Sequence, residues 1–349
     1  MNDVTPFLDS TDVISDGSEM HIRMQRDGYL FVRGLLPTEL LDSLRLKFLT
    51  IARNAGWVEK GRPLTEAFAN LDSFCVEPNS DYMSIYGEMY KLQEFHALQH
   101  HPNLLGLLQR MCGETVIPHP RIIGRTIFPQ RETYTTPAHQ DFIPIQGTAD
   151  TYTAWFPLHD LPHEMGGLQV AEGSHKKGVY DFRPALGAGG MEVLDLLEGQ
   201  WRTNTFARGD VLFFHSLCVH KGVVNSGTSL RQSIDARYQR YNEPIDSKSF
   251  LPHISPVTWE EIYHDWPNEN YKYYWHDLNM QLSDYDFSYH QERDRLAFEM
   301  ADVGDERSRS TLQRIVTRDT DLEKRKRAKE ALQKLKATVQ RQRVMGDSQ

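Results

Sequence analysis

The sequence predicts a mainly β protein with flanking helices, an α+β fold built on a double-stranded β-helix (jelly-roll) core. Between residues 121 and 240, short runs rich in β-branched and aromatic residues alternate with Gly and Pro. Such runs are typical of two packed antiparallel sheets. Helical periodicity before and after this region predicts N-terminal helices and a C-terminal helical extension.

Hydrophobic periodicity, together with the Gly, Pro and capping residues between periodic segments, predicts the elements along the chain. Residues 1–20 are rich in Asp, Ser and Thr, and we expect a mobile N-terminal arm there. A helix is predicted over residues 37–56, and residues 80–112 are predicted to be helical with a break near Pro102. The predicted strands are residues 122–128, 152–158, 168–171, 203–206, 211–215 and 232–238.

The composition favours one jelly-roll domain with additions at its ends. We assign that domain to residues 21–250. Residues 251–290 are crowded with Trp, Tyr, His and Asp, which suits packing against the core. Residues 291–349 form a charged helical C-terminal extension, which is either a homodimer contact or an independent hairpin. The stretch from 182 to 202 interrupts the strands and is either a lid or a surface insertion.

The charge and the cysteines exclude several classes of protein. A net charge of −9 argues against a nucleic-acid groove. The basic run at residues 324–327 has acidic neighbours and suits a solvated helix face. No stretch approaches the roughly 20 apolar residues of a membrane span. Cys75, Cys112 and Cys218 are odd in number and widely spaced, which favours a reducing compartment, and we expect a cytoplasmic protein.

One constellation carries chemistry. His139 and Asp141 form a His-x-Asp motif, and on a strand both side chains would point to the same face. His220, seventy-nine residues after Asp141, would supply a second imidazole. Two His and one carboxylate leave three positions open on a non-heme Fe(II), as needed for a cosubstrate and O2. Arg231, eleven residues after His220, is suited to bind the far carboxylate of 2-oxoglutarate as a bidentate pair.

In order and spacing, these four residues resemble the phytanoyl-CoA dioxygenase family of Fe(II)- and 2-oxoglutarate-dependent oxygenases. The resemblance covers about residues 20–240 and includes Asp27-Gly28-Tyr29 and Gly173-Ser174-His175. It implies hydroxylation of an unactivated C–H bond in a small organic molecule, with release of succinate and CO2. It also implies that Trp155 lines the cosubstrate pocket, although a core position is equally compatible with a Trp there.

The chain departs from the family at one position. Relatives often carry a Ser two residues after the distal His, whereas Gly222 stands here and offers no hydroxyl. Ser229 or Thr228, near Arg231, is the predicted substitute in the cosubstrate pocket.

Two other functions remain open at the level of the residues. A metal-dependent hydrolase on a cupin-like barrel could use the same ligands with Zn2+ and an activated water, but it leaves Arg231 unexplained. A non-catalytic metal- or ligand-binding protein of the same fold is the other. Arg121, Arg125 and Arg237 either face an acidic substrate or pair with carboxylates.

Overall fold

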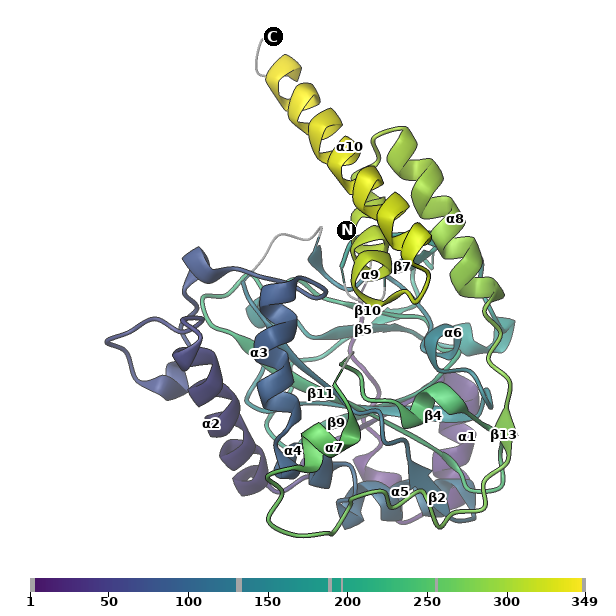
Figure 1. The fold of residues 1–349 in the computed structure, drawn as a ribbon. Coiled ribbons are helices and arrows are strands. Elements are labelled where there is room, and N and C mark those ends of the chain that lie inside the picture. Colours follow the sequence, from purple (N-terminus) through teal and green to yellow (C-terminus); the bar gives the residue numbers. More distant parts are fainter. Residues whose placement is uncertain (1–3, 130–133, 188–189, 196, 255–256, 347–349) are drawn as a thin grey trace.

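A computed structural model describes residues 4–129, 134–187, 190–195, 197–254 and 257–346. Its centre is a six-stranded antiparallel sheet packed against a three-stranded sheet, with helices around them (Figure 1). The larger sheet has the order β1-β9-β4-β11-β2, with β3 also paired to β11, and the smaller sheet has the order β10-β5-β8. The predicted α+β jelly-roll class is confirmed.

The strands lie close to the predicted runs, with one exception. The larger sheet comprises β1 (Tyr29–Val32), β2 (Val116–Pro118), β3 (Ile123–Ile127), β4 (Thr151–Pro157), β9 (Val211–His215) and β11 (Arg231–Arg240). The smaller sheet comprises β5 (Leu168–Ala171), β8 (Trp201–Arg202) and β10 (His220–Gly222). Two further pairs are β6 (Phe182–Pro184) with β7 (Met191–Val193) and β12 (Ile245–Asp246) with β13 (Leu282–Ser283).

The predicted strand at residues 203–206 is wrong. Only Phe206 forms a β-bridge there, with Leu161. The backbone N–H of Thr203 instead donates to the carbonyl of Thr5, and its hydroxyl donates to the carbonyl of Leu168. These bonds hold the segment in an irregular path.

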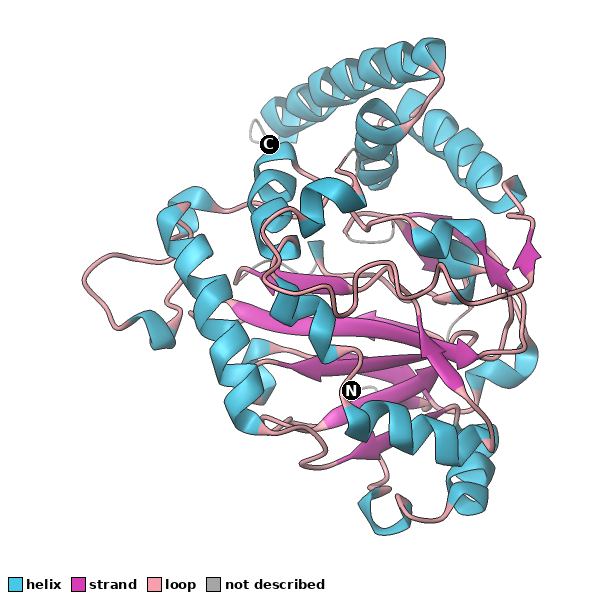
Figure 2. Ribbon diagram, turned by 60° about the horizontal axis from the view of Figure 1, so that its bottom comes forward, coloured by secondary structure: helices cyan, strands magenta, loops and turns pink. Residues whose placement is uncertain are grey.

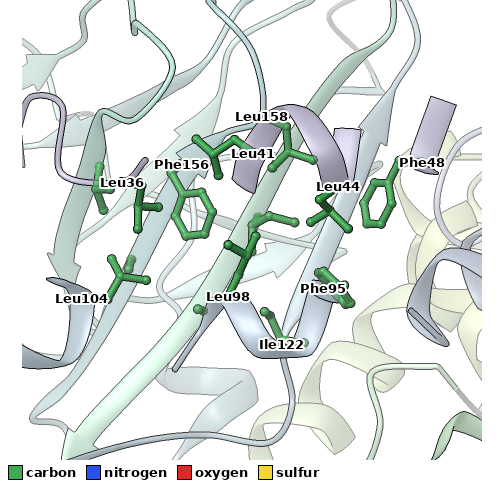
Figure 3. Packing of buried hydrophobic residues seen from close by; sticks show 14 of the residues in the cluster. Leu36, Leu41, Leu44, Phe48, Phe95, Leu98, Leu104, Ile122, Phe156 and Leu158 are labelled. Atoms are coloured by element: carbon green, nitrogen blue, oxygen red, sulfur yellow. The ribbon is translucent and has the colours of Figure 1, made fainter. Parts of the chain in front are cut away.

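Side chains that alternate between the two faces of the larger sheet form two separate apolar clusters, one between the sheets and one under the outer helices. In β1 and β9 one set of side chains, including Phe31 and Phe214, joins Trp155 and Val170 between the two sheets. The intervening side chains of these strands belong to a second cluster, which packs against helices on the outer face. Figure 3 shows this packing for Phe156 of β4 and the adjoining Leu158, which lie beside Leu41 and Leu44. Because the period of a strand is two, one face of each strand is fixed to the barrel interior and the other to the helices.

The helices before the barrel cover the outer face of the larger sheet (Figure 2). Residues 80–112 form three helices rather than one or two, because the chain also breaks at residues 91–92. The helices of this part are α1 (Gly17–Asp27), α2 (Thr38–Asn54), α3 (Ser80–Tyr90), α4 (Gln93–Leu98) and α5 (Pro102–Cys112). Short helices in the loops are η1 (Thr11–Val13), η2 (Leu64–Glu66), η3 (Leu71–Ser73), α6 (Phe142–Ile145), η5 (His163–Met165), η6 (Ser174–Lys177) and η7 (Ser247–Phe250).

The N-terminal residues that the structure describes do not form a free arm. Phe7 is 4% exposed and packs between the sheets, with its ring 5.1 Å from that of Tyr29. Residues 4–16 also form single β-bridges with the barrel, and α1 already begins at Gly17. The expectation of a mobile arm over residues 1–20 therefore fails for residues 4–20, since the sequence pattern concealed the buried Phe7.

The C-terminal third packs on the same core. Trp259, Trp266 and Trp275 belong to the apolar cluster under the outer helices, and α7 spans Trp259–Tyr263. Beyond them, three helices pack around Ala297, Leu312 and other apolar residues, which confirms the helical character predicted for the C-terminal extension. These are α8 (Ser288–Asp302), α9 (Arg309–Arg318) and α10 (Leu322–Gly346), with η8 (Glu306–Ser308) before α9. Within the described residues, no helix combines the length and the apolar character needed to cross a membrane.

The packing of α2 predicts that replacing two of its leucines by Ala changes the free energy of unfolding by very different amounts. Leu44 is 1% exposed and Leu46 is 49% exposed on the same helix. Leu44→Ala is expected to lower the free energy of unfolding by about 2–5 kcal/mol, because it leaves a cavity under the sheet. The matched control, Leu46→Ala, should change it by about 0.5 kcal/mol or less. Urea denaturation measures both, and equal losses would contradict the assigned face of the helix.

Candidate metal centre

The metal centre depends on a backbone bridge between two segments that are distant in sequence. The N–H of His139 donates to the carbonyl of His220 at 2.9 Å, and the N–H of His220 donates to the carbonyl of His139 at 3.0 Å. This antiparallel bridge extends the smaller sheet beyond β10. It sets the two imidazole rings 4.2 Å apart, centre to centre.

Both imidazoles are oriented by backbone carbonyls. Nδ1 of His139 lies 2.7 Å from the carbonyl of Pro137, and Nδ1 of His220 lies 3.1 Å from that of Cys218. A carbonyl can only accept, so each Nδ1 carries the proton and each Nε2 presents a lone pair. Burial and the neighbouring His220 lower the pKa of His139 to about 3, so this imidazole is neutral.

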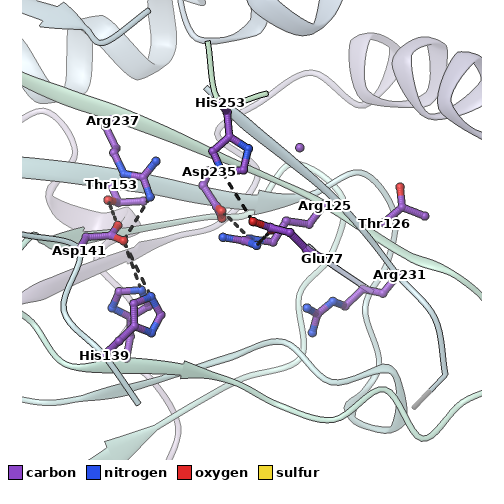
Figure 4. A network of polar contacts seen from close by, with 12 residues as sticks. Glu77, Arg125, Thr126, His139, Asp141, Thr153, Arg231, Asp235, Arg237 and His253 are labelled. Carbon is purple, nitrogen blue, oxygen red and sulfur yellow. Dashed lines mark hydrogen bonds and ion pairs between the residues drawn. The ribbon is translucent and has the colours of Figure 1, made fainter. Parts of the chain in front are cut away.

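The carboxylate of Asp141 completes the group. Its Oδ1 lies 3.9 Å from Nε2 of His139 and 3.9 Å from Nε2 of His220 (Figure 4). Contrary to the strand geometry expected for His-x-Asp, the ladder ends at His139, and Asp141 is the residue before α6. The two side chains still converge, and with His220 they form a group of ligand atoms that could hold one metal ion.

Two side chains hold the carboxylate of Asp141 in place. The hydroxyl of Thr153 donates to Oδ2 at 2.7 Å, and Nη2 of Arg237 donates to Oδ1 at 3.1 Å. Burial alone would raise the pKa of Asp141. The positive charge of Arg237 and the hydrogen bond from Thr153 outweigh burial, so the pKa lies well below its ordinary value. Asp141 is therefore an anion inside the barrel.

Gln140, between the two predicted ligands, has a structural role that the sequence did not indicate. Its side-chain amide donates to the carbonyls of Gly178 and Leu217, and its oxygen accepts from the N–H of Tyr180. Because it points away from the ligands, Gln140 ties the His-x-Asp segment to two other loops.

Arg231 is a buried cation without a carboxylate partner among the described residues. It is 4% exposed, its Nη1 donates to the carbonyls of Gly167 and Val223, and its Nε has no hydrogen-bond partner. Burial lowers the pKa of this guanidinium to about 10. A buried guanidinium that meets only neutral carbonyls is suited to a carboxylate ligand. Arg231 and Gly222 line the same cavity.

Comparison with known proteins identifies the family. Residues 24–233 match the family described as Phytanoyl-CoA dioxygenase (PhyH). The chain belongs to this family. It is 27% identical over 256 residues to the 1-deoxypentalenic acid 11-beta-hydroxylase of Streptomyces exfoliatus, covering 68% of this chain and 84% of that protein. It is 21% identical over 229 residues to the peroxisomal phytanoyl-CoA dioxygenase of Homo sapiens, covering 61% and 65% of the two chains.

Among solved structures, the non-heme alpha ketoglutarate dependent epimerase SnoN from nogalamycin biosynthesis aligns with a TM-score of 0.45 and 20% identity. That alignment covers 66% of this chain and 85% of the epimerase.

Membership of the phytanoyl-CoA dioxygenase family decides between the functions that the residues left open. The predicted class, an Fe(II)- and 2-oxoglutarate-dependent hydroxylase, is confirmed, and the hydrolase and the non-catalytic binding protein are set aside. The donor set fits this chemistry, because two neutral imidazoles and one carboxylate converge in a buried site.

The structure places neither Trp155 nor Ser229, the two other residues predicted for the cosubstrate pocket, in the lining of the cavity that contains Arg231. Trp155 is buried between the sheets against Phe206, with ring centres 4.9 Å apart, and lines none of the described cavities. Ser229 bridges the backbone of Phe68 before β11 begins and does not line the cavity of Arg231. A different serine near Arg231, Ser233, is fully buried, and its hydroxyl has no hydrogen-bond partner among the described residues.

Of the three arginines predicted either to face an acidic substrate or to pair with carboxylates, two pair with carboxylates and one does not. Arg125 pairs with Asp235 at 2.8 Å and with Glu77 at 3.1 Å, and Arg237 pairs with Asp141. Arg121 has no carboxylate within 4.0 Å among the described residues. All three line a cavity of about 190 Å³ that includes His139 and Asp141.

Proposed function

We propose that His139, Asp141 and His220 hold Fe(II) in this hydroxylase and that Arg231 binds the far carboxylate of 2-oxoglutarate. The observation that carries the proposal is the unpaired, buried guanidinium of Arg231 in the same barrel as the three converging ligands. The hydrolase alternative leaves this cation unexplained. When bound, Fe(II) with 2-oxoglutarate and O2 supplies the oxidising power for hydroxylation of an unactivated C–H bond, with succinate and CO2 as co-products.

The protein's own share of the reaction is position and charge. Thr153 and Arg237 fix the carboxylate of Asp141 and keep it ionised, while the carbonyls of Pro137 and Cys218 set the tautomers of the two imidazoles. The apolar cluster between the sheets excludes water from one side of the site. These contacts fix the ligands before any cofactor binds.

Ser233 is proposed as the second group that holds the cosubstrate, in place of Ser229. Ser233 follows Arg231 by two residues on β11, so both side chains point to the barrel interior. The buried hydroxyl of Ser233 has no partner among the described residues and can donate to the carboxylate that Arg231 is proposed to bind. Trp155 remains a proposed wall of this pocket, since it lies on the inward face of β4 two residues from Thr153.

The substrate is proposed to be a small organic acid. One relative is named as a hydroxylase of 1-deoxypentalenic acid, and the cavity beside His139 and Asp141 is lined with arginines. A cytoplasmic location stays a prediction, supported by the free thiols of Cys75, Cys112 and Cys218. A homodimer through the C-terminal helices also stays a prediction. The buried apolar residues of α8 and α9 already pack against one another and against α10 within this chain.

The decisive test is succinate formation by protein loaded anaerobically with Fe(II) and then given 2-oxoglutarate, O2 and a pool of organic acids. Turnover above background is expected, and Arg231→Ala should abolish it because the cosubstrate loses its only proposed cationic anchor. His139→Ala should abolish Fe(II) binding. Absence of both turnover and an Fe(II)-dependent 2-oxoglutarate absorbance band in the wild type would overturn the proposal.

The support of Asp141 by Thr153 can be tested with two similar threonines. Thr153→Val removes the hydrogen bond to Oδ2 and should weaken Fe(II) binding by roughly 10- to 100-fold, the usual effect of losing such a partner. Thr151→Val is the control, because the hydroxyl of Thr151 donates to the carbonyl of Thr148. Anaerobic Fe(II) titration measures both, and equal weakening would show that the effect is not specific to Asp141.

The choice between the two serines is a separate experiment. Ser233→Ala should raise the KM for 2-oxoglutarate by about tenfold or more, since a hydrogen bond to a charged group contributes about 1.5–3 kcal/mol. Ser229→Ala should leave it unchanged. Steady-state kinetics with 2-oxoglutarate as the varied substrate distinguishes them, and the reverse order would restore Ser229.

A further inference from the structure

The C-terminal helices form one wall of the cavity beside the metal ligands. The cavity of about 190 Å³ has His139 and Asp141 in its lining, together with Arg293 of α8 and Arg314 and Arg318 of α9. These helices lie beyond residues 24–233, the part that matches the family. Helices α8 and α9 lie against the end of the barrel near β7 and α6 (Figure 1), and the cavity lining shows that the extension reaches the site of the proposed metal ligands.

The charge of this cavity is opposite to that of the whole chain. Its lining contains seven Lys or Arg side chains and only two carboxylates, Glu77 and Asp141, whereas the chain carries a net charge of −9. Asp141 is already bonded to Arg237, and Glu77 is paired with Arg125 at 3.1 Å. A concave site lined by one sign of charge concentrates ligands of the other sign.

Several of these cations have no carboxylate of their own among the described residues. Arg314 shares Glu77 with Arg125: its Nη2 is 3.8 Å from that carboxylate, and its Nη1 has no hydrogen-bond partner among the described residues although Arg314 is only 8% exposed. Arg318 contacts the sulfur of Met83 at 3.7 Å, and Nη1 of Arg121 is 3.5 Å from the carbonyl of Lys248. For Arg121 and Arg318, no carboxylate lies within 4.0 Å in the part of the chain that the structure describes.

The cations also destabilise one another. Burial lowers the pKa of Arg314 to about 9, with Arg318 contributing in the same direction against the opposing effect of Glu77. Burial likewise lowers the pKa of Arg121, and Arg318 adds to that effect. Crowding several cations in a buried or partly buried site around a single shared carboxylate costs free energy, and a bound anion lowers that cost.

The geometry points to a substrate whose carboxylate or phosphate group is bound by Arg121, Arg314 and Arg318, with the carbon to be hydroxylated directed toward His139 and Asp141. Arg314 and Arg318 are one helical turn apart on α9, so their side chains lie on the same face of that helix. This inference rests on the proposed function and deepens it, because it assigns substrate selection to the C-terminal extension.

Calorimetric titration of the full-length protein tests the assignment. The protein is loaded anaerobically with Fe(II) and saturated with 2-oxoglutarate, so that the cosubstrate site is filled. The probes are phenylacetate, phenyl phosphate and the neutral 2-phenylacetamide. At least one anion is expected to bind roughly tenfold or more tightly than the amide, since charge-assisted hydrogen bonds are about twice as strong as neutral ones. The tighter of the two anions identifies the group as carboxylate or phosphate.

The location is tested with Arg314→Gln/Arg318→Gln, which should lower the affinity for that anion by roughly tenfold or more. Arg309→Gln is the matched control, because Arg309 lies on the same helix, pairs with Glu306 and does not line the cavity. Arg121→Gln, on a different segment, replaces the double variant if the latter fails to fold.

Equal binding of anions and amide by the wild type would overturn the inference, as would unchanged anion affinity in the folded variants. Anion binding that disappears on saturation with 2-oxoglutarate would also overturn it. The absorbance band of Fe(II) with 2-oxoglutarate, recorded on the same samples, reports separately on the proposed function.

Discussion

The two backbone hydrogen bonds between His139 and His220 are the constraint on which the site depends. They join a loop to β10 of the smaller sheet and thereby bring one imidazole beside the other. Asp141 can reach both rings only because the ladder stops at His139 and the chain turns into α6. Gln140 fixes that turn through bonds to two other loops. Loss of this bridge would separate the ligands without changing any of them.

The barrel interior is divided between apolar and charged halves. Inward-facing aromatic residues of β1, β4 and β9 fill one part between the sheets. In the other part, inward-facing positions of β11 hold Arg231, Asp235 and Arg237. Buried charges are tolerated where they are paired, as Arg237 is with Asp141 and Asp235 with Arg125. Within the described residues, the buried Arg231 and the partly buried Arg121 and Arg318 have no carboxylate within 4.0 Å, and these are the positions where anionic ligands are proposed to bind.

Much of this could be predicted from the sequence, because the signals are local. The strands predicted from alternation are present with small changes in their bounds, and His139, Asp141 and His220 come together as their motif predicted. Strand parity also places Ser233 on the same face of β11 as Arg231. The burial of Phe7 and the approach of α9 to the metal centre depend on tertiary contacts that no local pattern encodes. For the same reason the sequence could not decide between paired and unpaired roles for Arg121, Arg125 and Arg237.

Two different parts of the chain contribute residues to the cavity beside His139 and Asp141. The part that matches the family contains His139, Asp141, His220 and Arg231, the residues proposed to hold Fe(II) and 2-oxoglutarate. The part beyond it contributes Arg293, Arg314 and Arg318 to the cavity that His139 and Asp141 also line. Helix α9 is held by apolar packing against α8 and α10, so its arginines are positioned by a small core of their own. Substitutions in that core are therefore expected to shift the α9 arginines while His139, Asp141 and His220 stay in place, because the two sets of residues are supported by different apolar clusters.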